Sequence, residues 1–184
     1  MIDLQKEINN CNKCGDLHKQ AKIFLQKGVT PFIIIGESPA KDGWIVSGRA
    51  FYNIDGKLQA SGRVLAKLLD ILGYRIEDTY FTECCKCIIE DRKMLDKCSS
   101  NCKPILLKQL ETIDCKLILT MGKSPTQALL GEKIKRYSDY VGKTFNIRIG
   151  ERDYKLLPIY HPSPLNPKGY KDNIPIFEKI KTLL

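Results

Sequence analysis

Residues Pro31–Phe51, PFIIIGESPAKDGWIVSGRAF, decide how the rest of the chain can fold. The stretch begins with a continuous apolar run, Phe32–Ile35, which ends at Gly36. Such a run predicts a short strand that is buried on both faces of a sheet. Glu37 follows directly, and ligands of open α/β sheets bind beyond the carboxyl ends of the strands. Glu37 is therefore a candidate for site chemistry, although an ordinary turn with a surface glutamate has the same pattern.

The length and composition bound the class of protein. A chain of 184 residues predicts one domain, residues 1–184, with one substantial core. A hydrophobic content of 43% and a charged content of 28% are those of an ordinary globular protein. The sequence contains no run of 18 or more apolar residues, so it predicts no membrane-spanning helix. Because the first residues lack an apolar signal core, we expect a cytoplasmic protein without a membrane partner.

The charge balance points to a polyanionic partner. Thirty Lys and Arg against 21 Asp and Glu give a formal net charge of +9. An excess of this kind favours nucleic acid, because binding releases condensed counterions. A lysine-rich proteome would give the same balance, so charge alone leaves the partner open.

Strands and helices are expected to alternate along the chain. Apolar and β-branched runs predict strands over residues 32–35, 79–87, 115–122 and 156–160. Helical periodicity and capping residues predict helices over residues 1–10, 61–72, 103–113, 124–130 and 174–184. A charged connection is expected over residues 88–101, and a small hairpin over 145–148 and 154–157. The alternation predicts an α/β fold, a three-layer α/β/α sandwich around a short, mostly parallel four-stranded sheet.

Eight cysteines in a reducing compartment favour a metal site over disulfides. Two distant pairs have the complement of a [4Fe–4S] cluster or a structural zinc: Cys11, Cys14, Cys87 and Cys102. Their spacing differs from that of zinc ribbons, in which both halves are usually CxxC. Three neighbours are alternative ligands: Cys84, Cys85 and Cys98. A CxxC redox pair and a set of scattered buried thiols also remain open, and Cys115 is expected to be an inert buried thiol.

The motifs together resemble family 4, the iron–sulfur branch, of the uracil-DNA glycosylase superfamily. Residues 36–40, Gly-Glu-Ser-Pro-Ala, resemble the GE(A/G)PG motif, and residues 48–51, Gly-Arg-Ala-Phe, resemble GRPF. Lys86-Cys87 is similar to the end of the NVVKC strand, and residues 161–165, His-Pro-Ser-Pro-Leu, to the HPS motif. The pieces occur in the family's order over nearly the whole chain, together with the four cysteines.

The resemblance implies hydrolysis of the N-glycosidic bond of uracil, or of another deaminated base, flipped out of DNA. Glu37 or Asp42 would orient water, and His161 would stabilise the negative charge that develops on the base. Phe51 would stack on the base, and Leu165 would fill the space that the base vacates. Other residues would line the substrate pocket or hold phosphates: Gly36, Ser38, Glu83 and Ser163 in the pocket motifs, with Arg49, Ser61, Ser124 and Lys168 as further phosphate candidates. Each of these also has an ordinary structural interpretation, such as a core phenylalanine, a core histidine or a surface leucine.

Two departures from the family pattern bear on the substrate. Glu83 stands where the family has the asparagine that reads the base. An ionised carboxylate offers only acceptors and would repel O4 of uracil, whereas a protonated one imitates an amide. Alternatively, Glu83 reads an exocyclic amine such as N4 of cytosine. After Ala40 the family has acidic residues, and this chain has Lys41, with Asp42 as the nearest carboxylate.

The sequence therefore predicts a monomeric DNA repair glycosylase with a [4Fe–4S] cluster. The alternative is a glycosylase-like protein that binds damaged DNA without excising a base, and Glu83 favours it. A zinc-stabilised α/β enzyme of unrelated chemistry is a third interpretation.

Overall fold

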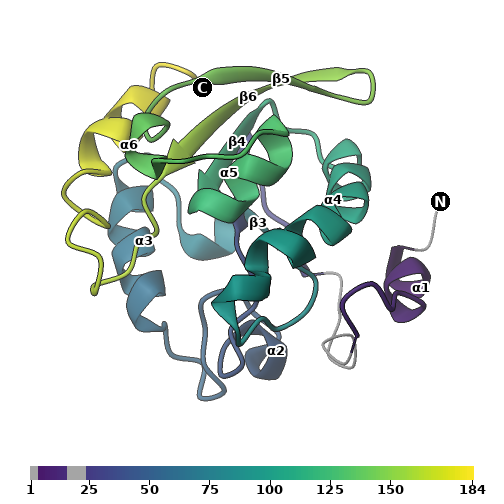
Figure 1. The fold of residues 1–184 in the computed structure, drawn as a ribbon. Coiled ribbons are helices and arrows are strands. Elements are labelled where there is room, and N and C mark those ends of the chain that lie inside the picture. The colour runs from purple at the N-terminus through teal and green to yellow at the C-terminus, as the bar shows by residue number, and fades with distance from the viewer. Residues whose placement is uncertain (1–3, 16–23) are drawn as a thin grey trace.

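The computed structural model describes residues 4–15 and 24–184, and its centre is a sheet in the order β1-β3-β2-β4-β6-β5 (Figure 1). Four neighbouring strands are parallel: β3 (Tyr80–Glu83), β2 (Phe32–Gly36), β4 (Leu117–Met121) and β6 (Arg152–Ile159). Two antiparallel strands form the edges: β1 (Leu25–Gln26) and β5 (Phe145–Ile149). The α/β class and the four parallel strands are confirmed, but the sheet has six strands rather than four. The expected hairpin adds β5 to β6, and two residues of β1 add the other edge.

Helices cover both faces of the sheet, with bounds α1 (Leu4–Asn9), α2 (Trp44–Ser47), α3 (Ala60–Asp70), α4 (Leu95–Glu111), α5 (Lys123–Leu130) and α6 (Ile174–Ile180). Single 3-10 turns occur at η2 (Ile76–Asp78), η3 (Arg92–Met94) and η4 (Tyr137–Asp139). In Figure 1, α3 and α6 lie on one side of the sheet and α4 and α5 on the other. These are the three predicted layers. No helix in the described part of the chain is long and apolar enough to cross a membrane.

Three bounds expected from the sequence are wrong. The connection over residues 88–101 contains the first two turns of α4, and the strand expected over 79–87 ends at Glu83. The start of α4 escapes detection because its inward positions include Cys98, Ser99 and Cys102, which give a weak apolar period. The last helix ends at Ile180, four residues earlier than expected, and residues 1–3 of the first expected helix lie outside the described residues.

The continuous apolar run of β2 is explained by the two cores that it separates. Phe32 and Ile34 belong to the core beneath α3 and α6, while Ile33 and Ile35 belong to the core beneath α4 and α5. All four side chains are fully buried. A central parallel strand with both faces covered needs an apolar residue at every position, which is the pattern that the sequence has.

The topology places several loops at one edge of the sheet. From β2 the chain crosses to β3 on one side and then to β4 on the other, so the strand order switches between β2 and β4. Gly36 pairs with Glu83 in register, and Met121 pairs with Ile159, so the carboxyl ends of all four parallel strands are level. This edge is where ligands of doubly wound sheets bind.

Candidate active site and cysteine cluster

A cavity of about 180 Å³ lies at the carboxyl ends of the parallel strands. The phosphate candidate Ser61 lines it, together with six of the predicted catalytic and substrate-binding residues: Gly36, Glu37, Ser38, Phe51, Glu83 and His161. They come from strand ends and loops that lie far apart in the sequence. A larger hollow of about 740 Å³ lies at the other end of the sheet, beside Pro31 and Leu117, and contains none of the predicted site residues.

Glu37 lies at the carboxyl ends of the parallel strands, where Arg92 and Gly122 confine its carboxylate. Its Oε2 lies 2.5 Å from Nη2 of Arg92, and its side chain is 16% exposed. On the other side, a Cβ added at Gly122 would lie 2.7 Å from Oε1 of Glu37. Gly122 also has a φ of +100°, which favours glycine, so both its conformation and the carboxylate select this residue.

Glu83 brings a second carboxyl group into the cavity. It is 8% exposed, and its Oε2 has no hydrogen-bond partner within the described part of the chain. Burial, opposed by nearby Lys86, raises the pKa of this carboxyl to about 8. The group is therefore mostly neutral at pH 7. Gly36 leaves room for this carboxyl group, because an added Cβ would lie 2.3 Å from Oε2 of Glu83 and the side chain would have to shift.

His161 follows the end of β6 and faces the same cavity. Burial lowers its pKa below the ordinary value of 6.5, and Glu37 opposes that shift. The imidazole is therefore neutral at pH 7 and carries one N–H donor. The loop after it is fixed by buried Asn173, whose side chain bonds the backbone of Tyr160 and Gly169 at 2.8 to 3.0 Å.

Phe51 is held in a conformation that aromatic residues rarely adopt. Its φ is +65°, and it is the only non-glycine residue with positive φ among those described. Its ring packs edge-on against Phe81 with centroids 4.7 Å apart. An added Cβ at Gly62 would lie 2.8 Å from Cβ of Phe51, so this glycine makes room for the ring. Strain of this kind persists where the surrounding structure fixes a residue for function.

The remaining predicted residues lie outside the cavity. Asp42 is exposed and contacts Gln59 through its carbonyl oxygen, so the structure does not bring its carboxylate to the site. Leu165 is 93% exposed on the loop after His161, and the hydroxyl of Ser163 accepts a hydrogen bond from its backbone N–H.

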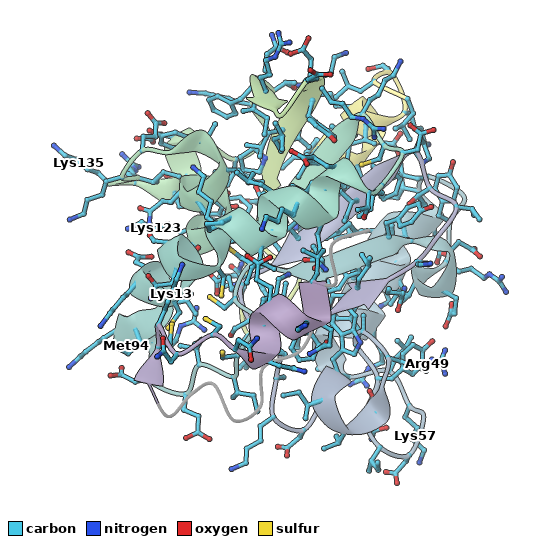
Figure 2. All side chains as sticks on the ribbon, turned by 90° about the vertical axis from the view of Figure 1, so that its right-hand side faces the viewer. Lys13, Arg49, Lys57, Met94, Lys123 and Lys135 are labelled. Atoms are coloured by element: carbon cyan, nitrogen blue, oxygen red, sulfur yellow. The ribbon has the colours of Figure 1, made fainter. Side chains whose placement is uncertain are left out.

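The structure gathers most cysteines in a separate region beneath the loop that follows β3. One small core holds Cys85, Cys87 and Cys98, with Cys14 packed against it, and sulfur atoms are visible near Lys13 and Met94 in Figure 2. Cys102 belongs to the same neighbourhood, because burial first and then the nearby Cys102 sulfur raise the pKa of Cys87, and both also raise the pKa of Cys98. The thiol of Cys11 is close enough to contribute to the raised pKa of Cys87. By contrast, Cys84 and Cys115 lie in the core beneath α4.

Hydrogen-bond donors point at two of these sulfurs. Asn101 Nδ2 lies 3.3 Å from Sγ of Cys14, and the backbone N of Lys86 lies 3.4 Å from Sγ of Cys102. The Lys86 ammonium is buried and donates to the hydroxyl of Thr82 and to the carbonyl of Glu83. Donors and a buried cation stabilise sulfur that carries negative charge. Among residues 4–15 and 24–184, no three His, Cys, Asp or Glu side chains converge on a point that would hold a single metal ion.

Sequence reasoning missed part of the cavity wall: Ala40, Trp44, Gln59, Phe81, Arg92 and Met121. Trp44, the single tryptophan, gave a usable signal, because a large aromatic residue in a polar loop needs a packing partner. It packs on Phe24 and Phe81. Arg92 gave no such signal.

Comparisons with known proteins agree on one family. The family model described as Uracil DNA glycosylase superfamily matches residues 24–182. Among curated proteins, the chain is 30% identical over 192 residues to the Type-4 uracil-DNA glycosylase of Saccharolobus solfataricus, covering 97% of this chain and 83% of that protein. It is 29% identical over 169 residues to the Type-4 uracil-DNA glycosylase of Archaeoglobus fulgidus, covering 88% and 80%.

Proposed function

The chain belongs to the uracil DNA glycosylase superfamily, and we propose that it is a DNA repair glycosylase that hydrolyses the N-glycosidic bond of uracil flipped out of DNA. The observation that carries this proposal is the cavity at the strand switch, which is lined by Glu37, Phe51, Glu83 and His161. A small pocket with aromatic side chains and several polar groups in its wall suits one base rather than a base pair.

In this proposal each of the main residues in the cavity wall has its own role. The ring of Phe51 stacks on the base, and the neutral imidazole of His161 donates its N–H to the base oxygen that gains negative charge as the bond breaks. Glu37 orients the water that attacks the sugar or shapes the pocket beside the base. The side chain of Leu165, which is almost fully exposed, inserts into the DNA base stack at the position that the flipped base leaves.

Glu83 reads the base as a neutral carboxylic acid. Its carbonyl oxygen accepts the N3–H of uracil and its hydroxyl donates to O4, the same pair of contacts that an amide makes. The unpaired, buried Oε2 supports this role, because a buried polar atom without a partner is available for a ligand. The proton can sit on either oxygen, so Glu83 alone also matches N3 and N4 of cytosine.

We also propose that the clustered thiols hold a [4Fe–4S] cluster, with Cys11, Cys14, Cys87 and Cys102 as ligands. Donors to the sulfurs of Cys14 and Cys102 support this assignment. Four irons spread their thiolates over a wider volume than one zinc at about 2.3 Å would. Cys98 and Cys85 are the neighbours that can replace a ligand. The bound cluster would cross-link the N-terminal segment to α4 and would be a structural element.

We propose further that residues 1–184 form one domain that acts as a monomer in the cytoplasm. DNA is its partner, in keeping with the charge of +9.

The test is base excision from oligonucleotides that carry a single uracil, hypoxanthine, xanthine, ethenocytosine or cytosine. Strand cleavage by alkali after incubation reports the abasic site. We expect cleavage at uracil at pH 7 and none at paired cytosine. Binding of every oligonucleotide without cleavage of any would replace the proposal with the second candidate, a damage-binding protein, which Glu83 in the base-reading position favours.

A further inference from the structure

We propose that Arg92 is a positioning residue that holds the Glu37 carboxylate in its place in the cavity. This inference rests on the proposed function. Arg92 lies outside every sequence motif that pointed to the site, at the start of η3, and its guanidinium forms part of the cavity wall.

The geometry confines Glu37 on two sides. Nη2 of Arg92 contacts Oε2 at 2.5 Å, while the backbone of Gly122 faces Oε1 so closely that no Cβ fits between them. The carboxylate is 16% exposed and the arginine 72% exposed, so Arg92 closes the solvent side of a mostly enclosed group. A charge-assisted contact fixes both the position and the direction of a carboxylate.

Arg92 stands on a segment that is itself fixed against Glu37. The backbone N–H of Cys85 donates to the carbonyl of Glu37 at 2.9 Å, extending the β2–β3 pairing into this segment. Asp91 caps η3 by accepting the N–H of Lys93 at 3.0 Å, and Met94 packs into the cysteine core. Residues 85–92 therefore contact both the backbone carbonyl and the side-chain carboxylate of Glu37. An isolated surface ion pair would contact the carboxylate alone.

The charges around Glu37 give Arg92 a second, measurable effect. The groups that face the carboxylate are Arg92 from η3, His161 after β6, Tyr137 from η4, and Glu83 with Cys84 from the end of β3. Glu37 raises the pKa of His161, and Arg92 lowers it. When the guanidinium is removed, the negative charge of Glu37 is no longer opposed by a positive charge, so the pKa of His161 rises. If neutral His161 is the active form, the acid limb of the rate profile then moves to higher pH.

The test compares Arg92→Gln, Arg92→Lys and the control Lys93→Gln, which removes the same charge from the same exposed turn. Single-turnover excision of uracil is measured at saturating protein across pH 5 to 8, with DNA affinity by fluorescence anisotropy. For Arg92→Gln we expect a rate constant lowered about tenfold or more, an acid limb at higher pH, and DNA affinity equal to that of Lys93→Gln. Arg92→Lys should recover part of the rate.

Two results would overturn the inference while leaving the glycosylase intact. One is a rate and pH profile for Arg92→Gln equal to those of Lys93→Gln. The other is weaker DNA binding with an unchanged rate at saturation, which would make Arg92 a phosphate contact. A wild-type protein that excises no base would instead remove the proposed function, and this inference with it.

Discussion

Replacing Glu83 by glutamine should change how uracil excision depends on pH. If the neutral acid reads uracil, activity is present below the pKa of Glu83 and is lost as pH rises through it. Burial places that pKa at about 8, so the neutral fraction is about nine-tenths at pH 7 and about one-tenth at pH 9. The wild-type rate should therefore fall about tenfold between these pH values. A glutamine amide keeps both contacts and does not titrate in this range.

The assay is the single-turnover rate on a uracil oligonucleotide at pH 6, 7, 8 and 9, expressed as the ratio of wild type to Glu83→Gln. The ratio removes the contributions of groups that both proteins share, among them Lys86, whose pKa burial lowers to about 8. His161, whose pKa burial lowers, is also shared by both proteins, so the ratio removes its contribution as well. Glu90→Gln, which removes an exposed carboxylate on the next loop, should follow the wild type.

A ratio that stays constant from pH 7 to 9 would refute the protonated acid as the reader of the base. Stability provides an independent check. The folded-state pKa of Glu83 is raised, so its burial costs the fold stability as pH rises from 4.5 towards 8. Glu83→Gln should therefore melt at a higher temperature than wild type at pH 9, and the difference should shrink at pH 4. An equal difference at both pH values would contradict the burial of an ionisable group there.

Further predictions concern the stacking residue, the loop after His161 and the cysteines. Gly62→Ala should lower uracil excision by displacing Phe51, at a cost in stability of about 1–3 kcal/mol measured by urea unfolding, and an unchanged rate in a variant destabilised by this amount would contradict a role for the position of Phe51. Leu165→Ala should change stability by less than about 0.5 kcal/mol, because the side chain is 93% exposed. It should nevertheless slow excision from duplex DNA about tenfold more than from single strands; equal slowing on both substrates would exclude a wedge. Cys102→Ala should lose iron and visible absorbance, whereas Cys115→Ala, which removes a buried thiol from the other core, should keep both. Full iron content in Cys102→Ala would move the ligand to Cys98.

The sequence predicted the frame of the site well because strand ends leave local signals. The apolar run that ends in Gly36 located the edge of the sheet, and parallel pairing brings Glu83, where β3 ends four residues before the predicted end of that strand, level with it. Asp42 was proposed because it is the nearest carboxylate to Glu37 in the chain, but the turn over residues 41–43 leaves it exposed and outside the cavity lining, so its role stays a prediction. Arg92 was missed because an exposed charge in a loop has no periodicity, and only the folded chain shows its partner.

The inward face of early α4 was missed for a related reason. Its buried positions Cys98, Ser99 and Cys102 face the clustered cysteines rather than an apolar core. Hydrophobic periodicity therefore begins only near Ile105. Likewise, Asn173 appears as an ordinary loop residue until its amide is seen bonding the backbone on both sides of His161. Polar residues that fix the backbone of a site are recognised by their burial, which a single sequence does not display.

The most direct test of the central claim is the time course of abasic-site formation by the wild-type protein on an oligonucleotide with one uracil at pH 7. The account predicts complete conversion of that strand, with the matching cytosine strand intact. A protein that binds the uracil strand and leaves it uncleaved after alkali would contradict it.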